Sequence, residues 1–84
     1  SYLLDETVIE TILVAVRKLP EKTQQVVQSV MCPGLSYQET ADELEVSINT
    51  VKTLLKAGMR ELRSELEEYK KMFLFFMLYP QNFQ

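Results

Sequence analysis

Apolar residues recur every three or four positions along most of this 84-residue chain, which is the spacing of one face of an α-helix. A first amphipathic helix is predicted over about residues 5–18, with Asp5 as its N-cap. A second is predicted over about residues 21–31, because Pro20 can end one helix and open the next. The pair Pro33-Gly34 then predicts a break in the chain.

Two serines each precede a run with helical spacing in the middle of the chain. Ser36 is followed three residues later by Glu39, the capping-box pattern, and predicts a helix over about residues 37–44. Ser47 predicts the start of another helix after a very short turn. The small side chain of Ala41 would allow these two helices to cross closely. This arrangement is typical of a helix-turn-helix.

The helix after Ser47 is predicted to be long. Its apolar stripe is formed by Ile48, Val51, Leu55, Gly58, Leu62, Leu66 and Tyr69. Gly58 on this stripe predicts tight packing against another helix, at a cost of roughly 1 kcal/mol in helix propensity. Leu54 is expected at the edge of the core, and contact with a thymine methyl group or a partner protein are its alternatives. The sequence therefore predicts an all-α fold, a small four-to-five-helix domain containing a helix-turn-helix with a long C-terminal recognition helix.

The segment 72–79 is apolar on every side of a helix, and Pro80 closes it. We therefore divide the chain into a helix-turn-helix domain, residues 1–71, and an apolar C-terminal extension, residues 72–84. Such a segment exposes too much apolar surface for a helix that faces water alone. We expect the long helix to continue into it and to bury it against the first helix or a neighbouring chain, which includes self-association through residues 72–79.

Composition argues against several classes of function. The chain has no histidine and one cysteine, Cys32, which argues against a zinc site and excludes a His-based triad and an internal disulfide. It has no glycine-rich phosphate loop and no nucleophile motif, so we expect no enzymatic activity, no cofactor and no metal.

The longest apolar run is eight residues, whereas a membrane span needs roughly 20. No signal peptide is visible, which favours a cytoplasmic protein. Ser1 is not a native start, so the chain is expected to be a piece of a longer protein.

The charges are distributed unevenly along the chain. A net charge of −3 is unusual for a protein that binds phosphates. Residues 47–63, however, carry four basic side chains against the single acidic residue Glu61, whereas the segments on both sides are net acidic. The locally basic stretch is therefore the predicted recognition helix. The alternative is that these charges form only the solvated face of a helix.

Polar side chains at the turn and on the recognition helix are suited to DNA binding. Asparagine can pair with adenine, lysine can donate to guanine, and threonine can contact phosphate or a thymine methyl group. The helix N-terminus at Tyr37 could meet phosphate with the help of its hydroxyl, or this side chain could pack under the turn. Lys52 and Lys56 are expected to contact phosphates rather than bases. The predicted DNA-binding residues are Tyr37, Ser47, Asn49, Thr50, Lys52, Thr53, Lys56 and Arg60.

An ordered set of short motifs resembles a known family. The motifs are Leu19-Pro20-Glu21-Lys22, Gly34-Leu35-Ser36-Tyr37-Gln38-Glu39 with Ala41, Val46-Ser47, Asn49-Thr50-Val51-Lys52-Thr53 and Leu62-Arg63. Over about residues 5–68 the chain resembles the C-terminal −35-recognition domain, region four, of extracytoplasmic-function (ECF) RNA polymerase sigma factors. The resemblance implies a four-helix domain whose fourth helix reads the promoter −35 element. It also implies contact with the β-subunit flap of core RNA polymerase, and an anti-sigma factor as a further partner. The family's promoter-melting domain, normally N-terminal to this one, is not part of this sequence.

Several positions depart from the family pattern. Glu45 stands where the turn commonly has Gly, Asn or Asp, and it costs roughly 1 kcal/mol if that position is left-handed. Thr40 stands where isoleucine is common. Leu54, Ala57 and Met59 stand where basic or polar side chains are common, which leaves fewer donors for DNA. We therefore expect the isolated domain to bind DNA weakly.

Two other functions fit the same residues. A LuxR-type response-regulator DNA-binding domain shares the Thr-Val-Lys run at residues 50–52, although residues 35–39 and 62–63 fit the sigma-factor pattern better. A protein-binding helical module, for an anti-sigma factor or for dimerisation, is supported by the acidic residues 1–46 and by the apolar extension.

Overall fold

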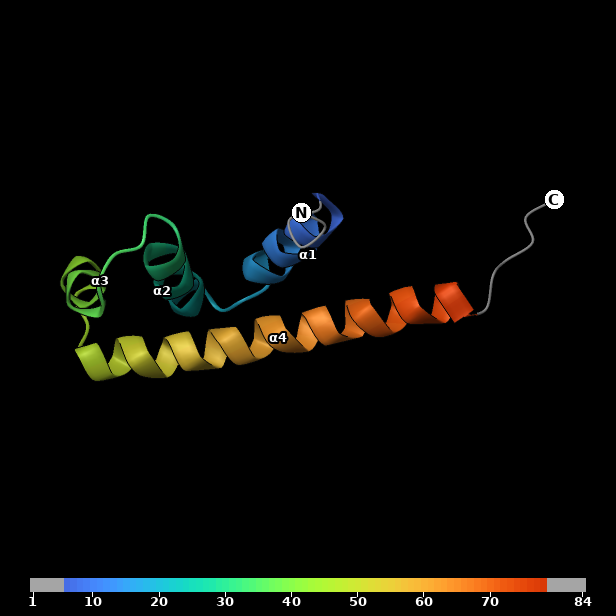
Figure 1. The fold of residues 1–84 in the computed structure, drawn as a ribbon. Coiled ribbons are helices and arrows are strands. Elements are labelled where there is room, and N and C mark those ends of the chain that lie inside the picture. The colour runs from blue at the N-terminus through green and yellow to red at the C-terminus, as the bar shows by residue number, and fades with distance from the viewer. Residues whose placement is uncertain (1–5, 79–84) are drawn as a thin grey trace.

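The computed structural model describes residues 6–78, which form four helices. These are α1 (Glu6–Arg17), α2 (Glu21–Met31), α3 (Tyr37–Leu44) and α4 (Ile48–Leu78). Figure 1 shows α3, α2 and α1 following one another along the same side of α4, whose C-terminal end extends beyond α1. The molecule is elongated, with extents of 56 × 22 × 16 Å. The all-α fold with a long last helix that the sequence predicts is confirmed.

The predicted helix boundaries agree closely with the structure. The second and third helices begin and end as expected, and the first ends at Arg17, one residue before its predicted end. Pro20 is the N-cap of α2, and its carbonyl accepts a 2.8 Å hydrogen bond from the backbone N–H of Gln24. The predicted cap at Asp5 and the predicted closure at Pro80 lie outside the described residues.

Two apolar clusters hold the shorter helices against α4. The first contains the buried Ala15, Val16, Leu19, Val27 and Leu62 and fixes α1 and α2. The second contains Val26, Ala41 and Val51 and fixes α3 at the start of α4. Leu55 packs against both clusters, so the helix-turn-helix and the N-terminal helices share one continuous core. Leu54 is half-buried against the second cluster, as its predicted place at the edge of the core requires.

At Gly58, α2 and α4 approach each other closely. A Cβ atom at this position would lie 2.7 Å from Cγ2 of Val27 and 3.0 Å from Cγ2 of Thr23. These separations are below ordinary van der Waals contact, so only glycine fits without movement of a neighbour. The tight helix packing predicted from glycine on the apolar stripe is confirmed, and it sets the distance of the recognition helix from α2.

The apolar segment continues α4 as predicted. Of the two predicted ways of burying it, burial against α1 is wrong, and burial against a neighbouring chain stays a prediction. The side chains of Met72 to Leu78 are 52–72 % exposed. The cause is geometric: α1 has only 12 residues, and it diverges from α4 towards its own N-terminus (Figure 1). No helix within residues 6–78 is both long and apolar enough to cross a membrane.

Candidate nucleic-acid interface

Reciprocal hydrogen bonds fix the start of α3. The Ser36 hydroxyl accepts from the backbone N–H of Glu39 at 3.0 Å, and the Ser36 N–H donates to Oε1 of Glu39 at 2.9 Å. The predicted capping box is therefore present. The backbone N–H of Ser36, and then its hydroxyl, lower the pKa of the Glu39 carboxyl below its ordinary value of 4.5. The carboxylate is thus ionised at neutral pH and suits the positive end of the helix dipole.

A left-handed residue makes the turn between α3 and α4 short. Glu45 has φ 56° and ψ 47°, and its N–H donates to the carbonyls of Ala41 and Asp42. The N–H of Val46 donates to the Ala41 carbonyl at 3.0 Å. The bond from Glu45 to Asp42 and the bond from Val46 to Ala41 together form the Schellman arrangement, which ends a helix and reverses the chain. The left-handed conformation considered for Glu45 from the sequence is confirmed.

The hydroxyls of Ser47 and Thr50 set the start of α4. The Ser47 hydroxyl accepts from the Thr50 N–H at 3.0 Å and donates to the Thr50 hydroxyl oxygen at 2.9 Å. The Ser47 carbonyl accepts from the N–H of Val51 at 3.1 Å. Both predicted site residues therefore have a structural role at the helix N-terminus.

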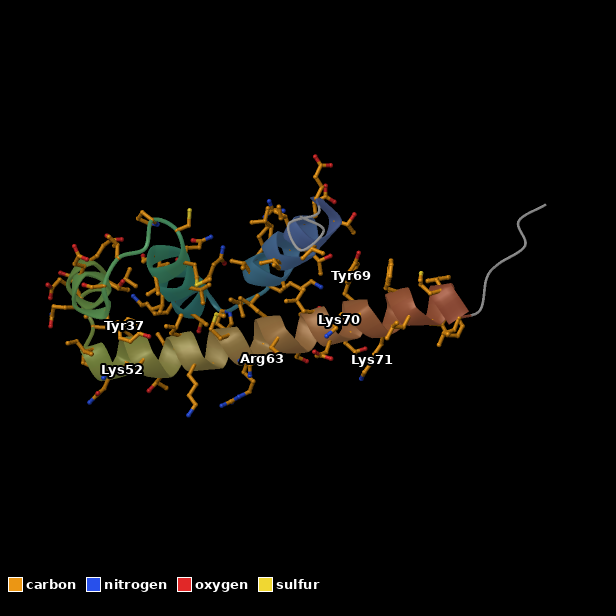
Figure 2. The ribbon with its side chains drawn as sticks, in the orientation of Figure 1. Tyr37, Lys52, Arg63, Tyr69, Lys70 and Lys71 are labelled. Carbon is orange, nitrogen blue, oxygen red and sulfur yellow. The ribbon has the colours of Figure 1, made fainter. Side chains whose placement is uncertain are left out.

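Polar side chains form one continuous stripe on the outer face of α4, which we call the α4 stripe. Its members are Asn49, Lys52, Thr53, Lys56, Arg60 and Arg63, and all are exposed. Their spacing of three or four residues keeps them on one side of the helix, over a length of about 21 Å or roughly six base-pair steps. Figure 2 shows Lys52 and Arg63 projecting from the side of α4 opposite α1–α3.

Arg63 is the member of the α4 stripe missing from the predicted DNA-binding residues. It belongs to the Leu62-Arg63 motif, and its numbering alone places it about one helical turn beyond Arg60. No ion pair within residues 6–78 involves the four basic side chains of the stripe, and the pairs present join Lys70 to Glu67 and Lys71 to Glu68. The basic groups are therefore open to a phosphate backbone. No three His, Cys, Asp or Glu side chains of this region are placed to hold a metal ion.

The exposed surface of α3 has the opposite character. Glu39, Asp42 and Glu43 are exposed on this helix, where Asp42 accepts a 2.9 Å hydrogen bond from Nε2 of Gln38. Tyr37 is 41 % exposed and belongs to neither core cluster. Tyr37 is thus partly open to solvent at the N-terminus of a helix that also exposes three carboxylates.

Comparison with known proteins identifies the family. The family model described as sigma-70, region 4 matches residues 9–62, which run from α1 to the middle of α4 and include the whole helix-turn-helix. The comparison with curated proteins and the comparison with solved structures gave no match. The domains of this family are DNA-binding and non-enzymatic, and they imply interaction with promoter DNA and RNA polymerase in transcription initiation. The chain therefore belongs to the sigma-70 region 4 family.

Proposed function

We propose that this chain is region four of an ECF sigma factor and binds the promoter −35 element through the α4 stripe. The observation that carries the proposal is the stripe itself: exposed donors without ion-pair partners on a helix whose start is fixed by Ser47 and by the left-handed turn. A helix-turn-helix presents its second helix to the major groove in this way.

The proposal divides the side chains by chemistry. Lys52 and Lys56 are phosphate contacts, because a flexible point charge positions the protein and discriminates weakly between bases. Arg60 can contact phosphate or, through its planar guanidinium, a guanine. Asn49 and Thr53, near the N-terminus of α4, are the candidates for contact with base edges. Tyr37 at the start of α3 and the Thr50 hydroxyl at the start of α4 are additional candidates for phosphate contact.

The partners named by the resemblance belong to the same proposal. In the cell the domain would join core RNA polymerase through the β flap, with an anti-sigma factor as a regulator, in the cytoplasm. A LuxR-type domain and a protein-binding module remain the alternatives. A transcription assay separates them from the ECF proposal. If the chain belongs to a sigma factor, RNA polymerase that carries this factor should need the α4 stripe to initiate at the factor's promoters.

Salt dependence of DNA binding tests the stripe directly. The duplex bound best by the chain is first selected from a random pool, and its affinity is measured by fluorescence anisotropy at several salt concentrations. Lys52→Ala with Lys56→Ala should lower the slope of log K against log salt by about 2, since each phosphate contact contributes about 0.9. The matched control, Lys70→Ala with Lys71→Ala, removes the same charge outside the stripe and should leave the slope unchanged.

The outcomes separate the proposal from its alternatives. An unchanged slope in the Lys52/Lys56 variant would show that these lysines do not contact phosphates, and an equal change in the control would show that bulk charge rather than the stripe attracts DNA. Asn49→Ala should relax the selected sequence at one position, whereas a loss that is uniform over all duplexes would exclude its role in base recognition.

A further inference from the structure

The four basic side chains of the α4 stripe are neighbours of one another on the helix. Lys52, Lys56 and Arg60 follow at intervals of four residues, and Arg63 follows Arg60 at an interval of three. Side chains at these intervals lie side by side, and like charges there destabilise a helix. No acidic residue stands three or four positions from Lys52, Lys56 or Arg60. The repulsion among these cations is therefore not compensated by acidic neighbours along this part of α4.

The next part of the same helix has the opposite pattern. Glu67 stands four residues after Arg63 but pairs with Lys70, with 3.5 Å between Oε1 and Nζ. A similar pair of opposite charges follows one residue later. Alternating signs of this kind are typical of a helix face that meets only water. The like charges at residues 52–63 thus differ from the exposed surface that follows them, and they favour a polyanion as their ligand.

The length of α4 separates the two arginines from the start of the helix. At a rise of about 1.5 Å per residue, Lys56 lies about 10 Å from Asn49 along the axis, whereas Arg60 and Arg63 lie about 16 and 21 Å from it. The major groove of DNA is about 12 Å wide. A helix whose first two turns lie across the groove therefore carries both arginines to the edge of the groove, where the phosphates of one strand lie.

Both arginines face in the same direction as the residues nearer the turn. At about 100° per residue, Lys56, Arg60 and Arg63 fall within about 60° of the helix circumference, and Asn49 falls between them. Figure 2 shows Lys52 and Arg63 on the side of α4 away from α1–α3. None of the other described helices therefore separates this face from a DNA duplex.

We propose that Arg60 and Arg63 form a phosphate-binding site at the edge of the major groove, the arginine site, while Asn49 and Thr53 contact bases inside the groove. This site deepens the proposed function and rests on it. Arg60 then contacts phosphate rather than guanine, and Arg63 becomes a further DNA-binding residue. A guanidinium can donate two parallel hydrogen bonds to one phosphate. A bound phosphate also offsets the repulsion between the two arginines.

Neutral phosphates test the arginine site. In the duplex selected by the full chain, single phosphates along both strands are replaced by methylphosphonates, and the affinity is measured by fluorescence anisotropy. One or two replacements beside the selected sequence should lower the affinity of the wild type several-fold. Arg60→Ala with Arg63→Ala should abolish the effect at those phosphates, and Lys52→Ala with Lys56→Ala should abolish it at different ones. The sequence selected by the arginine variant should be that of the wild type, because phosphate contacts do not read bases.

Salt dependence provides a second measurement with a matched control. Arg60→Ala with Arg63→Ala should lower the slope of log K against log salt by about 2, since each phosphate contact contributes about 0.9. The control, Arg17→Ala with Lys18→Ala, removes the same charge from exposed positions at the end of α1 and should leave the slope unchanged. Circular dichroism verifies that each variant keeps its helices.

The outcomes distinguish the arginine site from the proposed function. If the arginine variant keeps the wild-type slope and the wild-type set of sensitive phosphates, the site is overturned, although a lowered slope in the Lys52/Lys56 variant would still support the proposed function. If neither variant changes the slope, or the chain selects no duplex, the proposed function fails and the site fails with it. An arginine variant that selects a different base sequence would overturn the site in favour of a guanine contact.

Discussion

Gly58→Ala sets helix propensity against close packing at one position of α4. Alanine should gain about 1 kcal/mol over glycine in the interior of a helix. Its Cβ atom, however, would lie 2.7 Å from Cγ2 of Val27. Val27 is 3 % exposed and β-branched, so its side chain has little freedom to rotate away. Overpacking of this kind costs about 1–3 kcal/mol, and the expected net result is a loss of about 1 kcal/mol, or roughly 4–8 °C in Tm.

A double-mutant cycle measured by urea unfolding separates the two contributions. Val27→Ala alone should cost about 2 kcal/mol through the lost methyl groups. In that background Gly58→Ala should cost less or become stabilising, because the closer methyl group is absent and only the 3.0 Å approach to Cγ2 of Thr23 remains, which gives a coupling energy of about 1–2 kcal/mol. Ala57→Gly, one residue away and exposed, is the matched control and should cost about 1 kcal/mol by propensity alone. If Gly58→Ala stabilises the wild-type chain by about 1 kcal/mol, the close approach of α2 and α4 has been misjudged.

Three other changes have expected outcomes in the same unfolding assay. Thr40→Val should stabilise the fold by about 1–3 kcal/mol, because the Thr40 hydroxyl is fully buried without a hydrogen-bond partner, whereas Thr40→Ser should destabilise it. Glu45→Gly should gain about 0.5–1 kcal/mol by relieving the left-handed conformation, and Glu45→Ala, equally strained, should gain nothing. The folded-state pKa of Glu39 is depressed, so its contribution is present above the unfolded-state pKa and is lost as pH falls through the lower folded value. Glu39→Gln should therefore flatten the acid limb of a stability–pH profile, and an unaltered limb would count against the capping box.

Local hydrogen-bonding signals explain why much of this fold could be predicted from sequence. Ser36 with Glu39, and Ser47 before an apolar run, specify helix starts through bonds between residues three apart, and the structure contains both sets. Gly58 on the apolar stripe likewise predicts a close helix contact, because the stripe is the side of α4 that packs against other helices. The two caps depend on neighbours in the chain, whereas the glycine shows that another helix lies close without showing which one.

Features that depend on tertiary geometry could not be predicted in the same way. The full burial of Thr40 follows from the crossing of α2, α3 and α4, whereas its sequence context is that of an exposed polar helix. The exposure of residues 72–78 follows from the divergence of α1, which no periodicity encodes. Arg63 is different, because continuing the three-to-four spacing beyond Arg60 would have included it.

The same residues that build the helix-turn-helix also limit its attraction for DNA. The Glu39 carboxylate completes the cap of α3, and Asp42 and Glu43 expose two more carboxylates on that helix. In a helix-turn-helix the first helix crosses the phosphate backbone, so these charges oppose the attraction of the α4 stripe. Four basic side chains can make four phosphate contacts, which gives a slope of log K against log salt of at most about 3.6. Tight DNA-binding proteins make more such contacts. A domain with this balance binds a promoter productively when a larger complex holds it in place, which is the arrangement that a sigma factor on RNA polymerase provides.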